Sequence, residues 1–138
     1  MDQADLPSHP VLFFDGVCNL CDTFVSFAVR ADTLRTFRYA PLQGPTAGEL
    51  VPGHARSLSS VVLREPDGRV VTGADAVLLF LARLPARRCR ILARVARLFP
   101  RPLREAIYSA IARNRHVLFG RKPSCRLPSP SERALFLP

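Results

Sequence analysis

The chain has 138 residues, of which 48% are hydrophobic, and a formal net charge of +9. This length fits one domain, and this composition excludes a disordered chain. The longest strongly apolar run, 76–82, is far shorter than the ~18 residues of a membrane-spanning helix, and the acidic N-terminus does not resemble a secretion signal. We therefore expect a cytoplasmic protein made of a loose N-terminus (1–9), a core (10–84), a helical extension (85–121) and a proline-rich tail (122–138).

The charge is unevenly distributed along the chain. Residues 83–138 hold 14 Lys/Arg and 2 Asp/Glu, whereas residues 1–82 hold 6 and 9. Such a basic half can bind nucleic acid, an anionic membrane surface or an acidic partner. Because the arginines recur on helical patterns with apolar stripes, we favour solvated helix faces, expect no nucleic acid, and keep peripheral membrane contact as an alternative. On this interpretation the arginines of 87–115 face solvent and these residues pack inward: Ile91, Leu92, Val95, Ile107, Ala110 and Ile111.

The first half of the chain predicts a strand, a helix and a second strand. Residues 11–14 form an unbroken apolar run closed by Asp15-Gly16, which indicates a central strand buried on both faces. A helical pattern follows over about 18–31. Residues 36–40 alternate between aromatic and other side chains, which predicts the next strand. A right-handed βαβ unit is expected from this order.

The second half predicts a hairpin followed by helices. Pro66-Asp67-Gly68 lies between two runs rich in β-branched residues and favours a hairpin turn. The expected elements are a short helix at 46–50 within an irregular connection over 41–56, strands at 60–64 and 69–72, and helices at 73–84, 88–99 and 103–119. The tail is expected to be extended and packed back by Leu135 and Phe136.

Cys18 and Cys21 form a Cys-x-x-Cys pair at the predicted strand-to-helix junction. Two thiols at this spacing reach each other across the first helical turn, where free N–H groups and the helix dipole stabilise a thiolate. This favours dithiol–disulfide exchange with Cys18 as the nucleophile, Cys21 as the resolving thiol and no bound cofactor. Half of a zinc site or two inert buried cysteines are the alternatives.

The sequence FDGVCNLC, with Asp15, Cys18 and Cys21, resembles the signature of the DCC family of thiol-disulfide oxidoreductases. The later stretch REAIYSAIARNRHVLFGRKPSC resembles the C-terminal helix and third cysteine of that family, here Cys125. The resemblance implies an enzyme acting on protein or small-molecule thiols and disulfides. The element order resembles the thioredoxin-like order, so the expected fold is an α/β thioredoxin-like domain with a C-terminal helical extension.

Several roles have more than one interpretation. Asp15 is interpreted either as a general base for Cys21 or as a turn cap for residues 16–18, with an aspartyl phosphoryl nucleophile as a remote third alternative. Cys125 is either a third redox thiol or a free thiol in a loop, and Cys89 matches no motif. Thioredoxin-like proteins carry a cis-proline before their third strand, but residues 58–60 contain none. The alternative function is a non-enzymatic redox-sensing or metal-binding module whose basic helices bind an anionic membrane or acidic partner.

Overall fold

The structure, a computed structural model, describes residues 8–16, 19–57, 60–120, 130 and 133–137. In chain order the elements are β1 (Val11–Phe14), α1 (Asn19–Ala31), β2 (Arg38–Pro41), α2 (Pro45–Leu50), α3 (Pro52–Ser57), β3 (Val62–Arg64), β4 (Val70–Thr72), α4 (Gly73–Ala82), α5 (Arg87–Arg97), α6 (Arg101–Phe119) and the 3-10 turn η2 (Arg133–Leu135).

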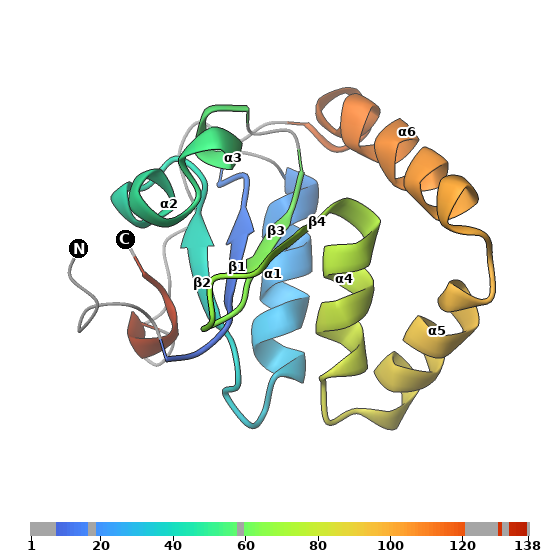
Figure 1. Cartoon of the computed structure of the whole chain (residues 1–138), viewed down its shortest axis with the longest axis horizontal. Coiled ribbons are helices and arrows are strands. Elements are labelled where there is room, and N and C mark those ends of the chain that lie inside the picture. The colour runs from blue at the N-terminus through green and yellow to red at the C-terminus, as the bar shows by residue number, and fades with distance from the viewer. Residues whose placement is uncertain (1–7, 17–18, 58–59, 121–129, 131–132, 138) are drawn as a thin grey trace.

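The four strands form one mixed sheet in the order β2-β1-β3-β4. Strand β1 runs parallel to β2 and antiparallel to β3, and β3 pairs antiparallel with β4. Figure 1 shows β1 inside the sheet with α1 directly after it. A βαβ unit joined to an antiparallel hairpin is the thioredoxin-like arrangement, so the predicted fold class is confirmed. The helices α5 and α6 form the expected C-terminal extension.

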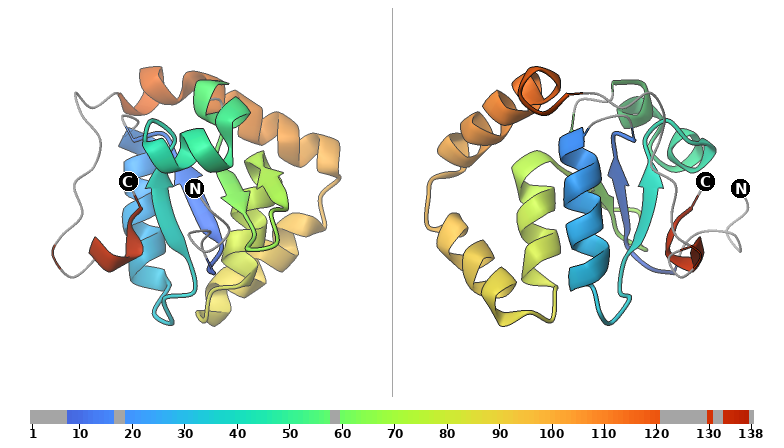
Figure 2. Two further views of the ribbon diagram at one scale, coloured as in Figure 1. Left: turned by 60° about the vertical axis from the view of Figure 1, so that its left-hand side comes forward. Right: turned by 180° about the vertical axis from the view of Figure 1, so that it is seen from behind.

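Strand β1 is buried on both faces because its side chains alternate between two hydrophobic cores. Leu12 and Phe14 belong to the larger core, which includes Phe80 from α4 and side chains of α1. Val11 and Phe13 belong to a smaller core beneath α2 and α3. The two views of Figure 2 show these two groups of helices on opposite faces of the sheet. This double burial explains the unbroken apolar run.

Most expected elements are present with ends shifted by one or two residues, and two differences concern the region around β2. Strand β2 begins at Arg38 rather than 36, because the backbone N–H groups of Thr36 and Phe37 donate to the carboxylate of Asp32, at 3.0 and 2.9 Å. The connection after β2 is also more regular than expected, since α3 occupies residues assigned to irregular structure. The predicted hairpin is confirmed, and Gly68 adopts a left-handed φ of 96° in its turn.

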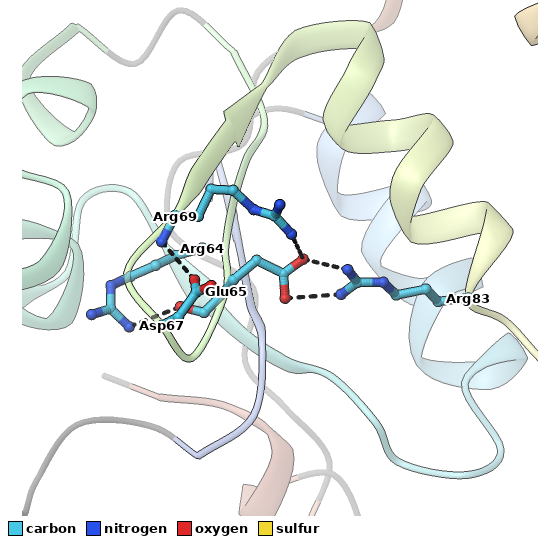
Figure 3. A network of polar contacts seen from close by, with 5 residues as sticks. All are labelled: Arg64, Glu65, Asp67, Arg69 and Arg83. Atoms are coloured by element: carbon cyan, nitrogen blue, oxygen red, sulfur yellow. Dashed lines mark hydrogen bonds and ion pairs between the residues drawn. The ribbon is translucent and has the colours of Figure 1, made fainter.

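The hairpin is tied to the end of α4 by a buried carboxylate (Figure 3). Glu65 is 6% exposed, and Arg83 donates to its Oε2 at 3.0 Å. Arg69 lies at 3.9 Å on the solvent side of the same carboxylate. A charge at the turn is therefore neutralised by the helix that packs against the sheet.

The packing predicted for the two basic helices is wrong for the apolar residues. The arginines mostly face solvent, as expected, but the apolar side chains are also exposed: Ile91 by 49%, Leu92 by 58%, Val95 by 48%, Ile107 by 54% and Ile111 by 44%, with Ala110 exposed as well. Helix α5 contacts α4 through the small buried residues Cys89 and Ala93. This contact is narrower than the apolar stripe, so most of the stripe lacks a covering layer.

The C-terminal segment packs back on the sheet, as predicted. Leu135 is buried, and the ring of Phe136 contacts the rings of Phe14 and Tyr39. Leu137 donates its N–H to the carbonyl of Tyr39 at 2.8 Å, and a parallel bridge joins Tyr39 to Phe136. In the part of the chain that the structure describes, no helix is long and apolar enough to cross a membrane.

Candidate functional site

The candidate site lies where β1 ends and α1 begins. Asp15 directly follows the carboxyl end of β1 and is only 5% exposed. Cys21 lies in the first turn of α1 and is 9% exposed. Helix α1 is held against the sheet because its apolar stripe, which includes Val25 and Ala28, packs in the larger core. The strand and helix thus bring a carboxylate and a thiol to the same end of the sheet.

Asp15 is held by two side chains from distant parts of the sequence. Gln43 donates from Nε2 to Oδ1 at 2.6 Å, and the same amide accepts the Gly16 N–H through Oε1 at 2.9 Å. Arg115 of α6 donates to Oδ2 at 3.1 Å, and the side chains of this ion pair are 5% and 11% exposed. The Gly16 N–H that the cap interpretation assigned to Asp15 is therefore bonded to Gln43.

A cavity of about 160 Å³ lies next to the thiol. Its wall is mainly apolar and includes residues of α1, α4 and α6. The lining residues are Asp15, Leu20, Cys21, Phe24, Ser60, Val61, Val77, Tyr108, Ile111, Ala112 and Arg115. The thiol of Cys21, the buried ion pair and the phenol of Tyr108 therefore share one small space, which can receive a short apolar segment of a substrate.

Tyr108 connects α6 to the start of the hairpin. Its oxygen accepts the backbone N–H of Val61 at 2.9 Å. Burial raises the pKa of Tyr108 above its usual value of 10.0, and the nearby Cys21 adds to this rise, whereas the Val61 bond and Arg115 oppose it. Tyr108 therefore stays a neutral phenol that can donate a hydrogen bond. Gly73 lies beside the ring. Its φ of 66° is a left-handed conformation that favours glycine, and a Cβ there would be in ordinary contact with the ring at 3.7 Å.

The other cysteines predicted to matter are separate or not described. Cys18 and Cys125 both lie outside the residues that the structure describes. Of the predicted Cys18–Cys21 pair, the structure therefore describes Cys21 alone. Cys89 is a buried free thiol in α5, which contacts α4, and it does not line the cavity. Residues 58–60 stand where thioredoxin-like proteins carry a cis-proline, and the structure describes Ser60 of this segment. The described residues contain no cis peptide bond.

Three residues of the site were missed by sequence reasoning: Gln43, Tyr108 and Arg115. The interpretation of the C-terminal arginines as solvated concealed Arg115. One signal was present, because Arg104, Tyr108 and Arg115 follow one another at helical spacing on a single face of α6. A polar stripe that interrupts an amphipathic pattern in this way indicates buried partners. Within the described segments, no three His, Cys, Asp or Glu residues come together as a possible metal site.

These features define a class: a thioredoxin-like domain that carries a thiol in the first turn of the helix after its central strand. The chain belongs to the DCC1-like thiol-disulfide oxidoreductase family, whose model matches residues 12–121. It is 36% identical, over 143 aligned positions covering 100% of both chains, to a Bacillus subtilis (strain 168) protein named YuxK and described as uncharacterized. It is 37% identical over 124 positions to the Arabidopsis thaliana DCC family protein At1g52590, described as chloroplastic, covering 86% of this chain and 70% of the relative. No solved structure matches the chain.

Proposed function

We propose that the protein is a thiol–disulfide oxidoreductase that uses Cys18 and Cys21 as its dithiol. The observation that carries this proposal is Cys21 in the first turn of α1, next to an apolar cavity and a buried carboxylate. Family membership supports the reaction class. The dithiol itself carries the two electrons, so the proposed reaction needs no further cofactor.

The reaction would proceed through a mixed disulfide. The Cys18 thiolate attacks one sulfur of a substrate disulfide, an S–S bond forms between Cys18 and the substrate, and the other substrate sulfur leaves as a thiolate. Cys21 then loses its proton and attacks Cys18, which releases the second substrate thiolate and leaves a Cys18–Cys21 disulfide. Two electrons pass to the substrate, whose thiolates take up two protons. The reverse sequence oxidises a substrate dithiol, and the relative reduction potentials decide the direction.

Asp15 is proposed as the proton acceptor for Cys21 in the second step. Both groups line the same cavity, and Cys21 is nearly buried. Arg115 and Gln43 hold the carboxylate in one position. Arg115 also offsets the negative charge that would otherwise disfavour a thiolate nearby.

A mixed-disulfide trap tests the dithiol directly. The Cys21→Ser variant should accumulate a covalent complex with a substrate disulfide through Cys18, and reductant should release it. Cys89→Ser is the matched control, because Cys89 is also a buried cysteine but lies outside the cavity, and this variant should turn over normally. Reversible loss of two thiols in wild type, but not in Cys21→Ser, should accompany the trap. Normal turnover by Cys21→Ser would refute the proposed dithiol.

The Asp15→Asn variant tests the base. Removing the negative charge should speed alkylation of Cys18 near neutral pH, since a thiolate there is no longer repelled. Turnover should nevertheless slow, because release of the mixed disulfide has lost its proton acceptor. A stability measurement must show that the variant is folded at the assay temperature. Unchanged turnover would reduce Asp15 to a structural residue.

A further inference from the structure

Apolar side chains of α5 and α6 are exposed along both helices. These two helices run end to end past α4 at the right of Figure 1. Between the three helices lies a groove of about 410 Å³ whose wall is almost entirely apolar and includes Leu92, Phe99 and Ile107. We name the apolar–basic face as the groove together with the exposed side chains of α5 and α6 beside it.

The apolar surface extends beyond the groove. Leu98, at the end of α5, is 84% exposed, and Val117 and Leu118, at the far end of α6, are 87% and 65% exposed. These three residues do not line the groove, so a single segment bound inside it would leave them in water. Leu98 lies just before the 19-residue helix α6, and Val117 and Leu118 lie near its far end. This wide separation favours a partner with an extended surface over a short peptide segment.

The positive charge beside this surface indicates an anionic partner. Helix α5 contains five arginines, Arg87, Arg88, Arg90, Arg94 and Arg97, and no acidic residue. All five are exposed, and none forms an ion pair with an acidic side chain in the described part of the chain.

Two of these arginines lie next to exposed apolar side chains. Arg87, Ile91, Arg94 and Leu98 follow at spacings of four, three and four residues, so they lie along one stripe of the helix. Leu92 and Val95 line the groove on another side of the same helix. Helix α5 therefore has an apolar face and a face rich in arginine, which is typical of helices that lie in a membrane interface.

We propose that the apolar–basic face binds the surface of an anionic lipid bilayer. Leu98, Phe99, Val117 and Leu118 would enter the boundary between head groups and acyl chains, and the arginines of α5 would contact the anionic head groups. Ile111 lines both the groove and the cavity of Cys21, so binding would bring that cavity close to the bilayer. The protein would then be a peripheral membrane protein held by two helices.

Co-sedimentation with vesicles tests the proposal on the full chain. The wild type should sediment with vesicles that contain phosphatidylglycerol at about 0.15 M salt, and much less with vesicles of phosphatidylcholine alone. Arg87→Gln and Arg94→Gln should each weaken the partition about fivefold, the effect of one basic residue near an anionic surface. Leu98→Ser combined with Phe99→Ser should also reduce binding to phosphatidylglycerol vesicles.

The chain offers matched controls for both kinds of change. Leu34 is 72% exposed and Arg56 is exposed, and both lie outside the apolar–basic face. Leu34→Ser and Arg56→Gln should therefore bind vesicles like the wild type. Absence of vesicle binding, equal binding to neutral vesicles, or equal loss in the control variants would overturn the proposal. Concentration-dependent dimerisation without vesicle binding would likewise overturn it and assign the face to a second copy of the chain. Vesicle binding is measured without thiol chemistry, so its outcome is independent of the proposed reaction.

Discussion

The ion pair between Asp15 and Arg115 should contribute much of the stability with which α6 packs on the rest of the domain. Its N···O distance is 3.1 Å, which corresponds to an attraction of about 5 kcal/mol at an effective dielectric constant of about 20. Desolvation of both groups offsets part of this energy. Breaking a buried pair from one side typically costs about 3–5 kcal/mol, because a charge remains buried without its partner.

We therefore expect Arg115→Gln to lower the free energy of unfolding by about 3–5 kcal/mol. Asp15→Asn should cost a comparable amount, and the double variant should cost clearly less than the sum of the two. Urea unfolding of the four proteins gives the coupling energy from one double-mutant cycle. Asn has nearly the size and shape of Asp, whereas Gln is polar but shorter than Arg, so the double-mutant cycle is needed to separate the pairing from lost packing at position 115.

Arg113→Gln is the control for this cycle. Arg113 lies on the same helix two residues away, is exposed and has no ion pair among the described residues, so its change should stay within about 0.5 kcal/mol. A coupling energy between Asp15 and Arg115 below about 0.5 kcal/mol would refute the reasoning. Helix α6 would then have to be held by its other contacts, such as the hydrogen bond between Val61 and Tyr108 and the ion pair of Arg104 with Asp75 of α4.

Three further predictions concern titration and buried charges. Burial raises the pKa of both tyrosines of the chain, Tyr39 and Tyr108, so the folded protein holds their protons more tightly than the unfolded chain does. The free energy of unfolding should therefore fall as the pH rises above about 10. Because the chain has no tryptophan, absorbance can follow the tyrosinates, which should appear only with unfolding. Glu65→Ala removes the partner of Arg83 and should lower the free energy of unfolding in urea by about 1–3 kcal/mol. The loss is limited because Arg83 is partly exposed and recovers some hydration, and no loss at all would contradict the pairing. Asp32→Ala removes the acceptor of three hydrogen bonds, including that of the Tyr39 hydroxyl, and should cost at least about 2 kcal/mol by thermal unfolding, whereas a neutral result would exclude the capping role.

The local signals in the sequence were sufficient for the central part of the fold. The apolar run at 11–14 is uninterrupted because β1 packs against helices on both faces, and Pro66-Asp67-Gly68 marks the hairpin because its turn needs a left-handed glycine. Each of these features depends on neighbouring residues alone. The position of Cys21 in the first turn of a helix follows from the same local pattern.

The remainder of the site depends on contacts that local periodicity does not encode. Arg115 and Asp15 are 100 residues apart in the sequence, and their pairing exists only because α6 passes the end of β1. The exposure of Ile91 and Ile107 was misjudged for a related reason. An apolar stripe shows which face of a helix avoids water, but it does not show whether the protein itself supplies a cover for that face.

The β-bridge between Tyr39 and Phe136 also affects whether other chains can pair with the sheet. Strand β2 lies at the edge of the sheet, and an open edge offers N–H and carbonyl groups to any extended segment in solution. Residues 133–137 lie against this edge, where Leu137 already occupies the Tyr39 carbonyl. Removing this segment would take Leu135 and Phe136 away from the larger core and would also uncover a template for strand addition. The segment thus protects the edge strand against aggregation as well as supporting the core, and its loss should promote self-association at high protein concentration.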